Sequence, residues 1–295
     1  MAGDAIFEGV YTALVTPFRL DGEVDYEALR NLIHLQAEAG VDGIVPMGTT
    51  GESPTVGFEE HSNVIEVSIA AARGRLKVIA GTGANSTEEA LRLTRDALAA
   101  GADGTLQVTP YYNKPNQEGL FRHFSAVADL GLPVVLYNIP GRTAREIELD
   151  TVARLAEHPN VVAVKEAGGD AARVRQTLER CDLTMLSGDD DLTLPMMREG
   201  GRGVISVASN VAPDRVRDMV RAAMADNWDE AQQLHDALAP LFRDLFIDTN
   251  PIPVKAAMAM QGLIEETYRL PLCAMADDLR EQLRATLTRL ELVTT

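Results

Sequence analysis

The stretch Val161-Val162-Ala163-Val164-Lys165 is apolar for four residues in succession and then ends in a lysine. A short run that is continuously apolar, without alternation, is typical of a β-strand covered on both of its faces. Such strands belong to parallel sheets that are flanked by helices. The stretch therefore predicts a buried strand of an α/β protein, with Lys165 at its carboxyl end.

Seven further short, largely apolar runs lie within the first 207 residues, and several of them are also continuously apolar. They lie at residues 12–16, 43–47, 78–81, 105–108, 133–137, 184–187 and 203–207. Segments of helical length lie between them at residues 25–39, 170–180 and 192–199, and another follows the last run at residues 213–224. A further helix is expected to open on a capping box at residues 86–89 and to stop at Gly101. Eight strand–helix units without a long interruption predict a parallel (β/α)8 barrel, that is, a TIM barrel.

The alternative α/β architecture is a doubly wound sheet, which needs a loop for a dinucleotide or a phosphate. Gly81-Thr82-Gly83 follows a predicted strand, but Ser86 stands where the third glycine of the fingerprint belongs. The barrel is therefore the favoured fold.

The chain becomes wholly helical after the eighth run. Residues 228–246, 254–263 and 277–292 have helical patterns with no strand pattern among them. We therefore expect a catalytic barrel domain at residues 1–226 and a C-terminal helical domain at residues 227–295.

Charge and cysteine content limit the partners and the compartment. The 295 residues include 44 acidic and 27 basic ones, for a net charge of −17. Such a surface repels phosphate backbones and anionic lipids, so neither nucleic acid nor a membrane is an expected partner. Two cysteines in no metal-like spacing, Cys181 and Cys273, and a start without a basic signal region indicate a cytoplasmic protein.

Lys165 is the most informative of the polar residues at strand ends. Barrel enzymes carry their reactive groups at the carboxyl ends of the strands. A lysine buried there is either held in an ion pair, for instance with Glu166, or it is an amine nucleophile with a lowered pKa. Lowering that pKa from ~10.4 to near 7 requires roughly 4 kcal/mol of differential interaction. Position alone leaves both interpretations open.

Three other features stand at or just after the carboxyl ends of predicted strands, and each allows a functional and a structural interpretation. Tyr137 is either a proton carrier or a buried structural tyrosine. The GTTGE loop at residues 48–52 forms either an anion-binding nest or a plain turn. Arg142 either clamps a carboxylate or lies free in solvent.

The acidic run at residues 189–191 is a weak signal for a metal. The five histidines are scattered along the chain, and Asp190 or Asp191 is expected to cap the following helix instead. No metal site is predicted.

Eight short motifs follow one another in the order of a known family. They are GTTGES at 48–53, GTGAN at 81–85, TPYYNKP at 109–115, YNIPGRT at 137–143, KEA at 165–167, SGDD at 187–190, GVISV at 203–207 and NPIPVK at 250–255. Each motif is weak alone, but the ordered set covers essentially the whole chain. The chain thus resembles the dihydrodipicolinate synthases, within the wider family that includes N-acetylneuraminate lyase.

The resemblance implies that Lys165 attacks the ketone of pyruvate and forms a Schiff base. Thr49, Tyr112 and Tyr137 would relay protons, with Tyr112 reaching in from a neighbouring subunit. The loop that contains Thr49 and Thr50 would hold the pyruvate carboxylate. The tight dimers that this requires would pair into a homotetramer.

The resemblance also implies how the second substrate binds. Arg142 would receive the carboxylate of aspartate semialdehyde, and the main chain at Gly188 and Ile205 would lie beside the substrates. The product would be 4-hydroxy-tetrahydrodipicolinate, which belongs to lysine and diaminopimelate biosynthesis. No cofactor is expected, since the imine itself accepts the electrons.

Two alternatives remain at this point. An aldolase or lyase that cleaves N-acetylneuraminate or a 2-keto-3-deoxy sugar acid would keep Lys165, Tyr137 and the 48–52 loop. Arg142 and the segment at 111–115 favour the synthase over a sialic acid lyase, whereas the deoxysugar aldolases are harder to exclude. The other alternative, an inactive barrel that binds a 2-oxo acid, is disfavoured by the intact set of reactive residues.

The resemblance further suggests inhibition by lysine at a dimer interface. The matching positions are Ser53, Pro54, Phe58, His61, Asn85, Glu89 and Tyr111. Glu89 would pair with the α-ammonium group, and Asn85 and Tyr111 would bond the carboxylate. Phe58 replaces a histidine of some regulated bacterial enzymes, although an aromatic ring can pack on the aliphatic stem of lysine. The alternative is that these are ordinary interface residues.

Overall fold

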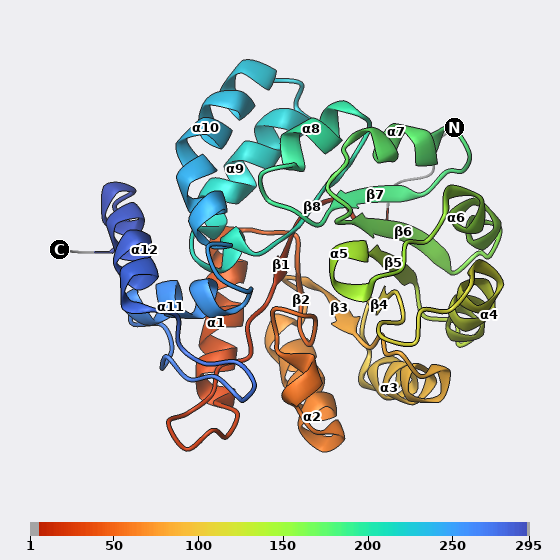
Figure 1. Cartoon of the computed structure of the whole chain (residues 1–295), viewed down its shortest axis with the longest axis horizontal. Helices are drawn as coiled ribbons and strands as arrows, with labels where there is room; N and C mark the ends of the chain where they lie inside the picture. Colours follow the sequence, from red (N-terminus) through yellow and green to blue (C-terminus); the bar gives the residue numbers. More distant parts are fainter. Residues whose placement is uncertain (1–5, 294–295) are drawn as a thin grey trace.

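The computed structural model describes residues 6–293 and contains a closed parallel barrel, in which the strands follow one another in sequence order (Figure 1). The predicted (β/α)8 barrel is therefore confirmed. The strands are β1 Gly9–Ala13, β2 Gly43–Val45, β3 Lys77–Gly81, β4 Gly104–Val108, β5 Val134–Asn138, β6 Val161–Glu166, β7 Thr184–Ser187 and β8 Gly203–Ser206.

The first strand differs from its prediction, because β1 ends at residue 13 whereas the predicted run was 12–16. Residues 9–16 are mostly apolar and buried, so hydrophobicity gives no sign of where pairing begins. The position is set by the neighbours: Gly9 pairs with Gly203, and Ala13 pairs with Val45. A side chain at Gly203 would overlap the main-chain oxygen of Gly9, so close strand approach determines the register there.

Helices cover the outside of the barrel. They are α1 Tyr26–Ala39, α2 Phe58–Ala72, α3 Thr87–Ala100, α4 Gln117–Ala128, α6 Leu149–Ala156, α7 Ala172–Leu178, α8 Thr193–Arg198 and α9 Pro213–Met224. The short helix α5 Pro140–Thr143 lies inside this ring, directly after β5 (Figure 1), and two short 3-10 turns are η1 Ser53–Thr55 and η2 Ala208–Asn210. The predicted boundaries of α1 hold for a local reason. The Asp25 carboxylate caps its first turn, and Gly40 ends it with a φ of 73°.

The predicted capping box at residues 86–89 does not form. Ser86 occupies the N-cap position of α3, but its side chain accepts no hydrogen bond from the helix. The neighbouring Thr87 hydroxyl bonds to His123 on α4 instead. The acidic side chains of Glu88 and Glu89 still favour the helix, because they lie at the positive end of its dipole.

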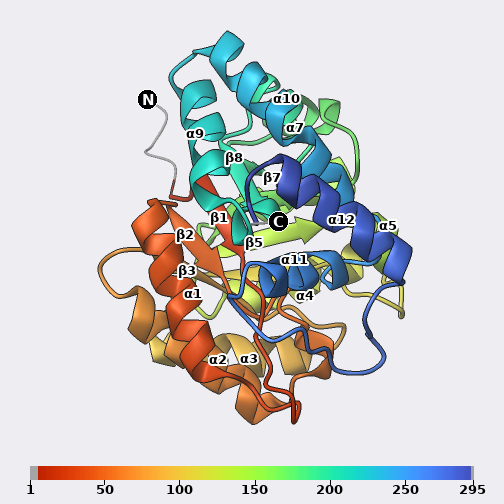
Figure 2. The same cartoon turned by 90° about the vertical axis from the view of Figure 1, so that its left-hand side faces the viewer.

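Three C-terminal helices, α10 Trp228–Asp244, α11 Ile252–Met260 and α12 Asp277–Arg289, pack against one side of the barrel, beside α1 and α9 (Figures 1 and 2). Asp244 at the end of α10 accepts hydrogen bonds from Gln282 and Thr286 of α12. Buried residues of these helices, such as Leu241 and Leu283, belong to the same hydrophobic cluster as the barrel core.

Among residues 6–293, none of the helices combines the length and the apolar character that crossing a bilayer requires.

Candidate active site

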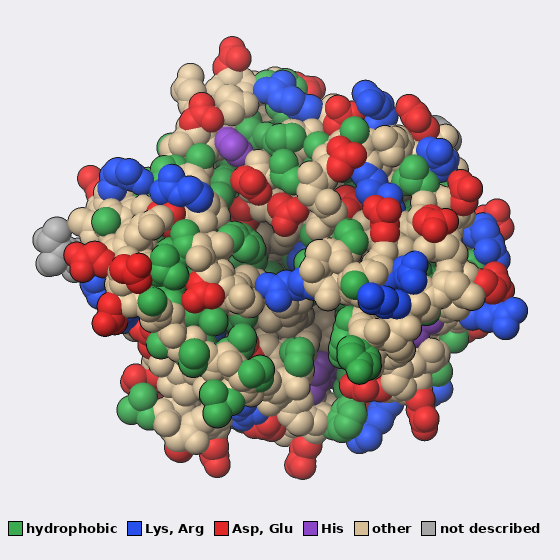
Figure 3. Space-filling model, in the orientation of Figure 1, with side chains coloured by type: hydrophobic (Ala, Val, Ile, Leu, Met, Phe, Trp, Pro, Cys, Tyr) green, Lys and Arg blue, Asp and Glu red, His purple; other side chains and the backbone are tan. Residues whose placement is uncertain are grey.

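A pocket at the carboxyl ends of the strands collects the residues predicted to touch the substrates. The surface is hollowed near the centre of the barrel, with basic side chains at the rim of the hollow (Figure 3). Seven predicted residues line this pocket: Thr49, Thr50, Tyr137, Arg142, Lys165, Gly188 and Ile205. Residues more than 150 positions apart in the sequence thus meet in one place.

Lys165 lies at the carboxyl end of β6 and is 5% exposed. Burial disfavours its charged form and lowers its pKa to about 8, although Asp189 and Asp190 oppose the shift. Within the described residues Lys165 forms no ion pair, and Glu166 binds Arg173 instead. The ion-paired interpretation of Lys165 is therefore wrong, and a substantial fraction of its amine is neutral near physiological pH.

Tyr137 lies near the carboxyl end of β5 and pairs with Lys165 of the neighbouring strand β6. The lysine Nζ atom lies 4.3 Å from the centre of the phenol ring. Burial raises the pKa of Tyr137 above its ordinary value, and the nearby Arg142 and Thr49 only partly offset this. The phenol consequently keeps its proton at neutral pH and is available as a proton donor beside the amine.

The GTTGE loop at residues 48–52 forms a tight turn with two main-chain donors that are free among the described residues. Its turn is closed by bonds from Gly51 N to Gly48 O and from Glu52 N to Thr49 O, both of 3.1 Å. Within the described chain, the main-chain N–H groups of Thr49 and Thr50 donate to no protein acceptor. Free N–H groups in such a turn attract carboxylates.

The 48–52 loop is fixed at its far end by a buried ion pair. Glu52, in a left-handed conformation with a φ of 55°, bonds the ammonium group of Lys255 from α11 at 2.5 Å. Both side chains are completely buried. The Thr16 hydroxyl also donates to the carbonyl oxygen of Gly51. The loop is therefore held by the barrel and by the C-terminal helices together.

Arg142 lies in the short helix α5 that follows β5, and it is exposed at the edge of the pocket. One nitrogen of its guanidinium group donates to the main-chain oxygen of Asn250 at 3.1 Å. The other guanidinium N–H groups have no acceptor within the described residues, so a carboxylate can bind them in a fork.

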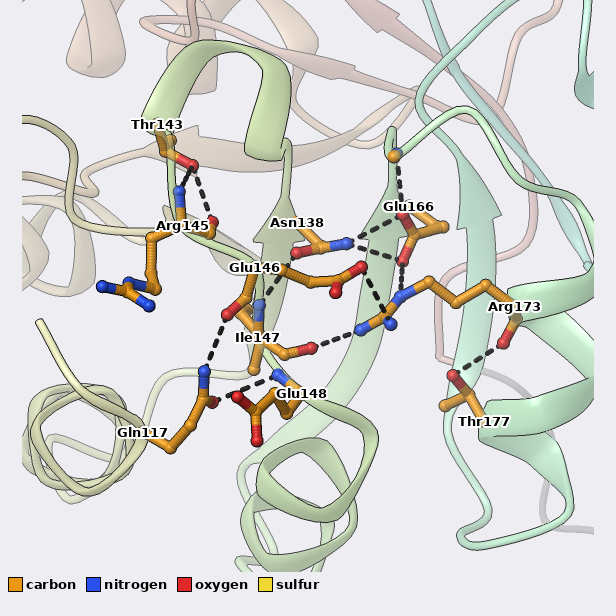
Figure 4. Close-up of polar contacts among 11 residues, drawn as sticks. Gln117, Asn138, Thr143, Arg145, Glu146, Ile147, Glu148, Glu166, Arg173 and Thr177 are labelled. Carbon is orange, nitrogen blue, oxygen red and sulfur yellow. Dashed lines mark hydrogen bonds and ion pairs between the residues drawn. The ribbon is translucent and has the colours of Figure 1, made fainter. Parts of the chain in front are cut away.

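A polar network behind the pocket anchors the loop that carries Arg142 (Figure 4). The Asn138 amide donates to both oxygens of Glu166, and Arg173 donates to Glu166 Oε2 at 2.9 Å. Asn138 Oδ1 accepts from the N–H of Ile147, and the Arg173 guanidinium bonds the Ile147 carbonyl. Strands β5 and β6 and helix α7 thus fix the far end of the loop.

The acidic run at residues 189–191 behaves differently from its prediction. Neither Asp190 nor Asp191 caps α8, whose N-cap is Leu192 without a side-chain bond. The buried Asp190 carboxylate instead accepts from the Ser206 hydroxyl and from the N–H groups of Val207 and Ala208. It fixes the chain directly after β8, where main-chain donors have no strand partner.

Asp189 lines the pocket beside Lys165, a position that was not assigned from the sequence. Burial raises the pKa of its carboxyl group to about 6. Asp189 could have been found from its position directly after a predicted strand, which the other residues of the site share. Across residues 6–293, no group of three histidine, cysteine or acidic side chains is arranged to hold a metal ion.

Tyr112 does not reach the pocket of its own chain. Its side chain is 90% exposed, and its backbone has a φ of 71°, which is rare for an aromatic residue. Tyr111 beside it lines a second cavity that also borders Thr49 and Tyr137.

Most of the residues matched to a lysine site line a third pocket, next to the second. Its walls include Ser53, Pro54, Phe58, His61, Glu89 and Tyr111. Asn85 is not part of the lining, and its main-chain oxygen accepts a bond from Asn113.

Two side chains of this third pocket have distinct environments. Burial lowers the pKa of His61 to about 4, so its ring is neutral, and it bonds the Gly81 carbonyl oxygen. The Phe58 ring lies under the guanidinium of Arg92, 4.7 Å from its centre.

Two residues of the C-terminal region, Phe246 and Asn250, also line the pocket of Lys165 and were not assigned to it from the sequence. Asn250 belongs to the NPIPVK motif, which gave a family match but no role. Because Asn250 is far from the barrel strands in the sequence, no local pattern indicated that it lines this pocket.

Known proteins resemble the chain over nearly its full length. A curated 4-hydroxy-tetrahydrodipicolinate synthase of Methanosphaerula palustris is 51% identical over 288 residues, which cover 96% of this chain and 98% of that protein. The crystal structure of dihydrodipicolinate synthase from Aquifex aeolicus has a TM-score of 0.95 at 50% identity, and the match covers 97% and 99% of the two chains.

A crystal structure of the related enzyme from Cyanidioschyzon merolae with lysine bound also has a TM-score of 0.95, at 42% identity over 98% of this chain and 100% of that one. The model of the dihydrodipicolinate synthetase family matches residues 6–290. Because that match spans almost the whole sequence, the chain belongs to the dihydrodipicolinate synthetase family.

Proposed function

We propose that the protein condenses pyruvate with L-aspartate 4-semialdehyde, through a Schiff base on Lys165, to give 4-hydroxy-tetrahydrodipicolinate for lysine and diaminopimelate biosynthesis. The observation that carries the proposal is a buried lysine with a pKa near 8, unpaired in the described chain and directly opposite a protonated tyrosine. The names of the relatives support the choice of reaction.

The first steps use the amine and the phenol. Neutral Lys165 adds through Nζ to the ketone carbon of pyruvate, and the resulting carbinolamine loses water to form the imine. Tyr137, with the Thr49 hydroxyl beside it, supplies the proton that the departing oxygen needs. Loss of a proton from the methyl group then gives an enamine, whose carbon attacks the aldehyde.

The pyruvate carboxylate binds the 48–52 loop. The free N–H groups of Thr49 and Thr50 and the Thr50 hydroxyl provide its donors. Gly188 and Ile205 line the same pocket. A Cβ at Gly188 would come within 3.0 Å of the Lys165 Cε atom, so a side chain there would crowd the nucleophile.

The second substrate is recognised by its carboxylate, which binds the Arg142 guanidinium at the pocket edge. After the new carbon–carbon bond forms, the substrate's own amine attacks the imine carbon. This ring closure releases the product and regenerates the Lys165 amine. Cleavage of a sugar acid is not favoured, because the relatives described above carry the synthase name.

Tyr112 of a neighbouring subunit completes the proton relay. Its almost complete exposure and its left-handed backbone support a role at an interface, since an isolated chain has no reason to present a large aromatic ring to water in this way. The assembly is a dimer of dimers, that is, a homotetramer.

The third pocket binds lysine as a feedback inhibitor. Glu89 pairs with the α-ammonium group, and Tyr111 bonds the carboxylate. Ser53, Pro54, His61 and Asn85 complete the site. Tyr111, Ser53 and Pro54 also border the cavity beside Thr49 and Tyr137, and this supports coupling between the two sites.

The chain divides into a catalytic barrel at residues 1–226 and a helical domain at residues 227–295. A cytoplasmic location suits a biosynthetic enzyme in which both cysteines are free.

The test is to trap the imine. The protein is treated with pyruvate and sodium borohydride, and the adduct is mapped by mass spectrometry, with activity measured on pyruvate and aspartate semialdehyde. Lys255 is an internal control, because it is also buried but is paired with Glu52. An adduct on Lys165 alone supports the function. Modification of another lysine, or none, contradicts it.

A further inference from the structure

Asn250 connects the two groups that the proposed function assigns to carboxylates. It lies between α10 and α11, is 6% exposed, and lines the pocket of Lys165. Its side-chain Nδ2 donates to the Thr50 hydroxyl oxygen at 3.0 Å. Its main-chain oxygen accepts from the Arg142 guanidinium at 3.1 Å. One residue of the C-terminal region thus contacts both anion-binding groups of the barrel.

The bond to Thr50 determines what the threonine hydroxyl can do. A hydroxyl has a single hydrogen to donate and two lone pairs that accept. Because Thr50 Oγ1 accepts from the Asn250 amide, that hydrogen points elsewhere. Among the described residues it finds no protein acceptor, so it remains available to a ligand in the pocket. The adjacent free N–H groups of Thr49 and Thr50 mark the same place as a carboxylate site.

We propose that Asn250 is a positioning residue for the pyruvate carboxylate, whose amide holds the Thr50 hydroxyl as a hydrogen-bond donor toward that group. The inference relies on the proposed function, because it takes pyruvate as the ligand of the 48–52 loop. Asn250 acts through Thr50.

The remaining contacts of the Asn250 side chain are consistent with this role. Its Oδ1 atom is buried and has no hydrogen-bond partner within the described residues. The amide therefore does not tie α10 to α11, and its one side-chain bond serves the pocket. A buried amide oxygen without a partner costs free energy, which is typical of a site arranged for binding.

The same C-terminal segment also holds the next part of the loop. Five residues beyond Asn250, Lys255 pairs with Glu52, two residues beyond Thr50. The segment therefore holds the loop at two points and limits its movement. A donor that is preorganised in this way binds a carboxylate without first losing conformational freedom.

The experiment measures how imine trapping at Lys165 depends on pyruvate concentration in Asn250→Ala and Asn250→Asp. The half-saturating pyruvate concentration should rise about tenfold in Asn250→Ala, as expected for a lost hydrogen bond to a charged ligand's site. Asn250→Asp should raise it further, since a carboxylate cannot donate and repels pyruvate. The KM for the aldehyde should stay within about twofold, because Arg142 bonds the main-chain oxygen, which both variants retain.

Two comparisons separate positioning from a structural effect. In a Thr50→Val background, Asn250→Ala should cause little further change, because both substitutions remove the same bond. Gln261→Ala is the matched control: that amide also joins the C-terminal region to the barrel, through the Val211 carbonyl oxygen, but lies outside the pocket. It should leave the pyruvate dependence unchanged.

The outcomes distinguish this inference from the proposed function. If the wild-type protein forms no adduct on Lys165, the function itself is contradicted. If the wild type forms the adduct and Asn250→Ala has the same pyruvate dependence, the positioning role is wrong. Loss of folded structure, or an equal rise in the constants for both substrates, would also overturn it, because either would assign Asn250 a general structural role.

Discussion

Lys165 and Tyr137 face one another directly across β5 and β6, with the amine nitrogen 4.3 Å from the centre of the phenol ring. Burial acts on the two groups in opposite directions: it lowers the pKa of the amine and raises that of the phenol. In both cases the neutral form is favoured. Burial therefore places a partly neutral amine and a protonated phenol side by side, as the proposed imine formation requires.

The rate of imine formation should increase with pH around a midpoint near 8. The amine reacts only when unprotonated, and a pKa of about 8 leaves roughly one lysine in ten neutral at pH 7, far more than an ordinary lysine would have. Stopped-flow measurement of imine formation, or timed trapping, gives the profile. A midpoint near the ordinary lysine value would contradict the proposed environment of Lys165.

Asp189 offers a way to shift that midpoint. Its negative charge raises the pKa of Lys165, so Asp189→Asn should move the midpoint to lower pH. Asp191→Asn is the control, because Asp191 is exposed and does not contribute to the shift at Lys165. Equal displacement in both variants would argue against a specific effect of Asp189.

Arg142→Ala should raise the KM for aspartate semialdehyde about 10- to 100-fold, with a much smaller effect on pyruvate. The guanidinium is a cation at the pocket edge, whereas the site proposed for pyruvate is the 48–52 loop, with main-chain N–H groups that are free in the described chain. A hydrogen bond to a charged group accounts for a loss of this size. Steady-state kinetics with each substrate varied in turn provides the measurement. Equal changes in the two constants would refute the assignment of Arg142 to the second substrate.

The barrel could be predicted because each strand carries its own local signal. Continuous apolar runs marked the strands, and Lys165 and Tyr137 were found because they end two of those runs. The start of β1 could not be found in this way, since its register depends on the contact of Gly9 with Gly203.

Pairings between distant segments could not be predicted. Asn250 is 200 residues from Thr50, and Lys255 is 203 residues from Glu52, so neither contact has a local pattern. Asp190 was expected to cap a helix because the sequence shows the following helix. It does not show the N–H groups after β8 that lack a strand partner and bond the Asp190 carboxylate.

The dimer requirement can be tested by mixing two inactive variants, Lys165→Ala and Tyr112→Phe. If Tyr112 acts across the interface, a mixed dimer contains one complete site and one that lacks both groups. Random reassembly should then restore about a quarter of the wild-type activity. Each variant alone, taken through the same dissociation and reassembly, is the control. An active monomer in sedimentation analysis, or no recovery on mixing, would contradict the shared site.

Lys255→Met should lower the free energy of unfolding by about 3–5 kcal/mol, because it leaves the Glu52 carboxylate buried without its partner. The double variant Glu52→Gln/Lys255→Met should lose less than the sum of the two single changes. Urea denaturation provides the values. Arg122→Ala is the comparison, since its pair with Glu118 is largely exposed and should contribute well under 1 kcal/mol. If Lys255→Met lowers the free energy of unfolding by no more than Arg122→Ala does, the buried pair does not stabilise the loop.

Lysine at millimolar concentration should reduce the initial rate, and Glu89→Gln should abolish this inhibition while leaving the KM for pyruvate unchanged. Glu89 lines the third pocket, and the substitution removes the charge that is proposed to pair with the α-ammonium group. The coupling between lysine and substrate is expected to be about 1–3 kcal/mol, as is typical of allosteric pairs. Calorimetry measures lysine binding directly.

Glu88→Gln is the matched control for this experiment. Glu88 precedes Glu89 in the same first turn of α3 but does not line the pocket, so the variant should bind lysine and be inhibited like the wild type. If both variants lose inhibition equally, the general charge of the helix start is responsible, and no specific site exists. If the wild-type protein shows no binding heat and no inhibition with lysine, then Ser53, Pro54 and Tyr111 are ordinary interface residues. Inhibition lost in Glu89→Gln alone would instead mean that lysine acts at the third pocket, which borders the cavity beside Thr49 and Tyr137.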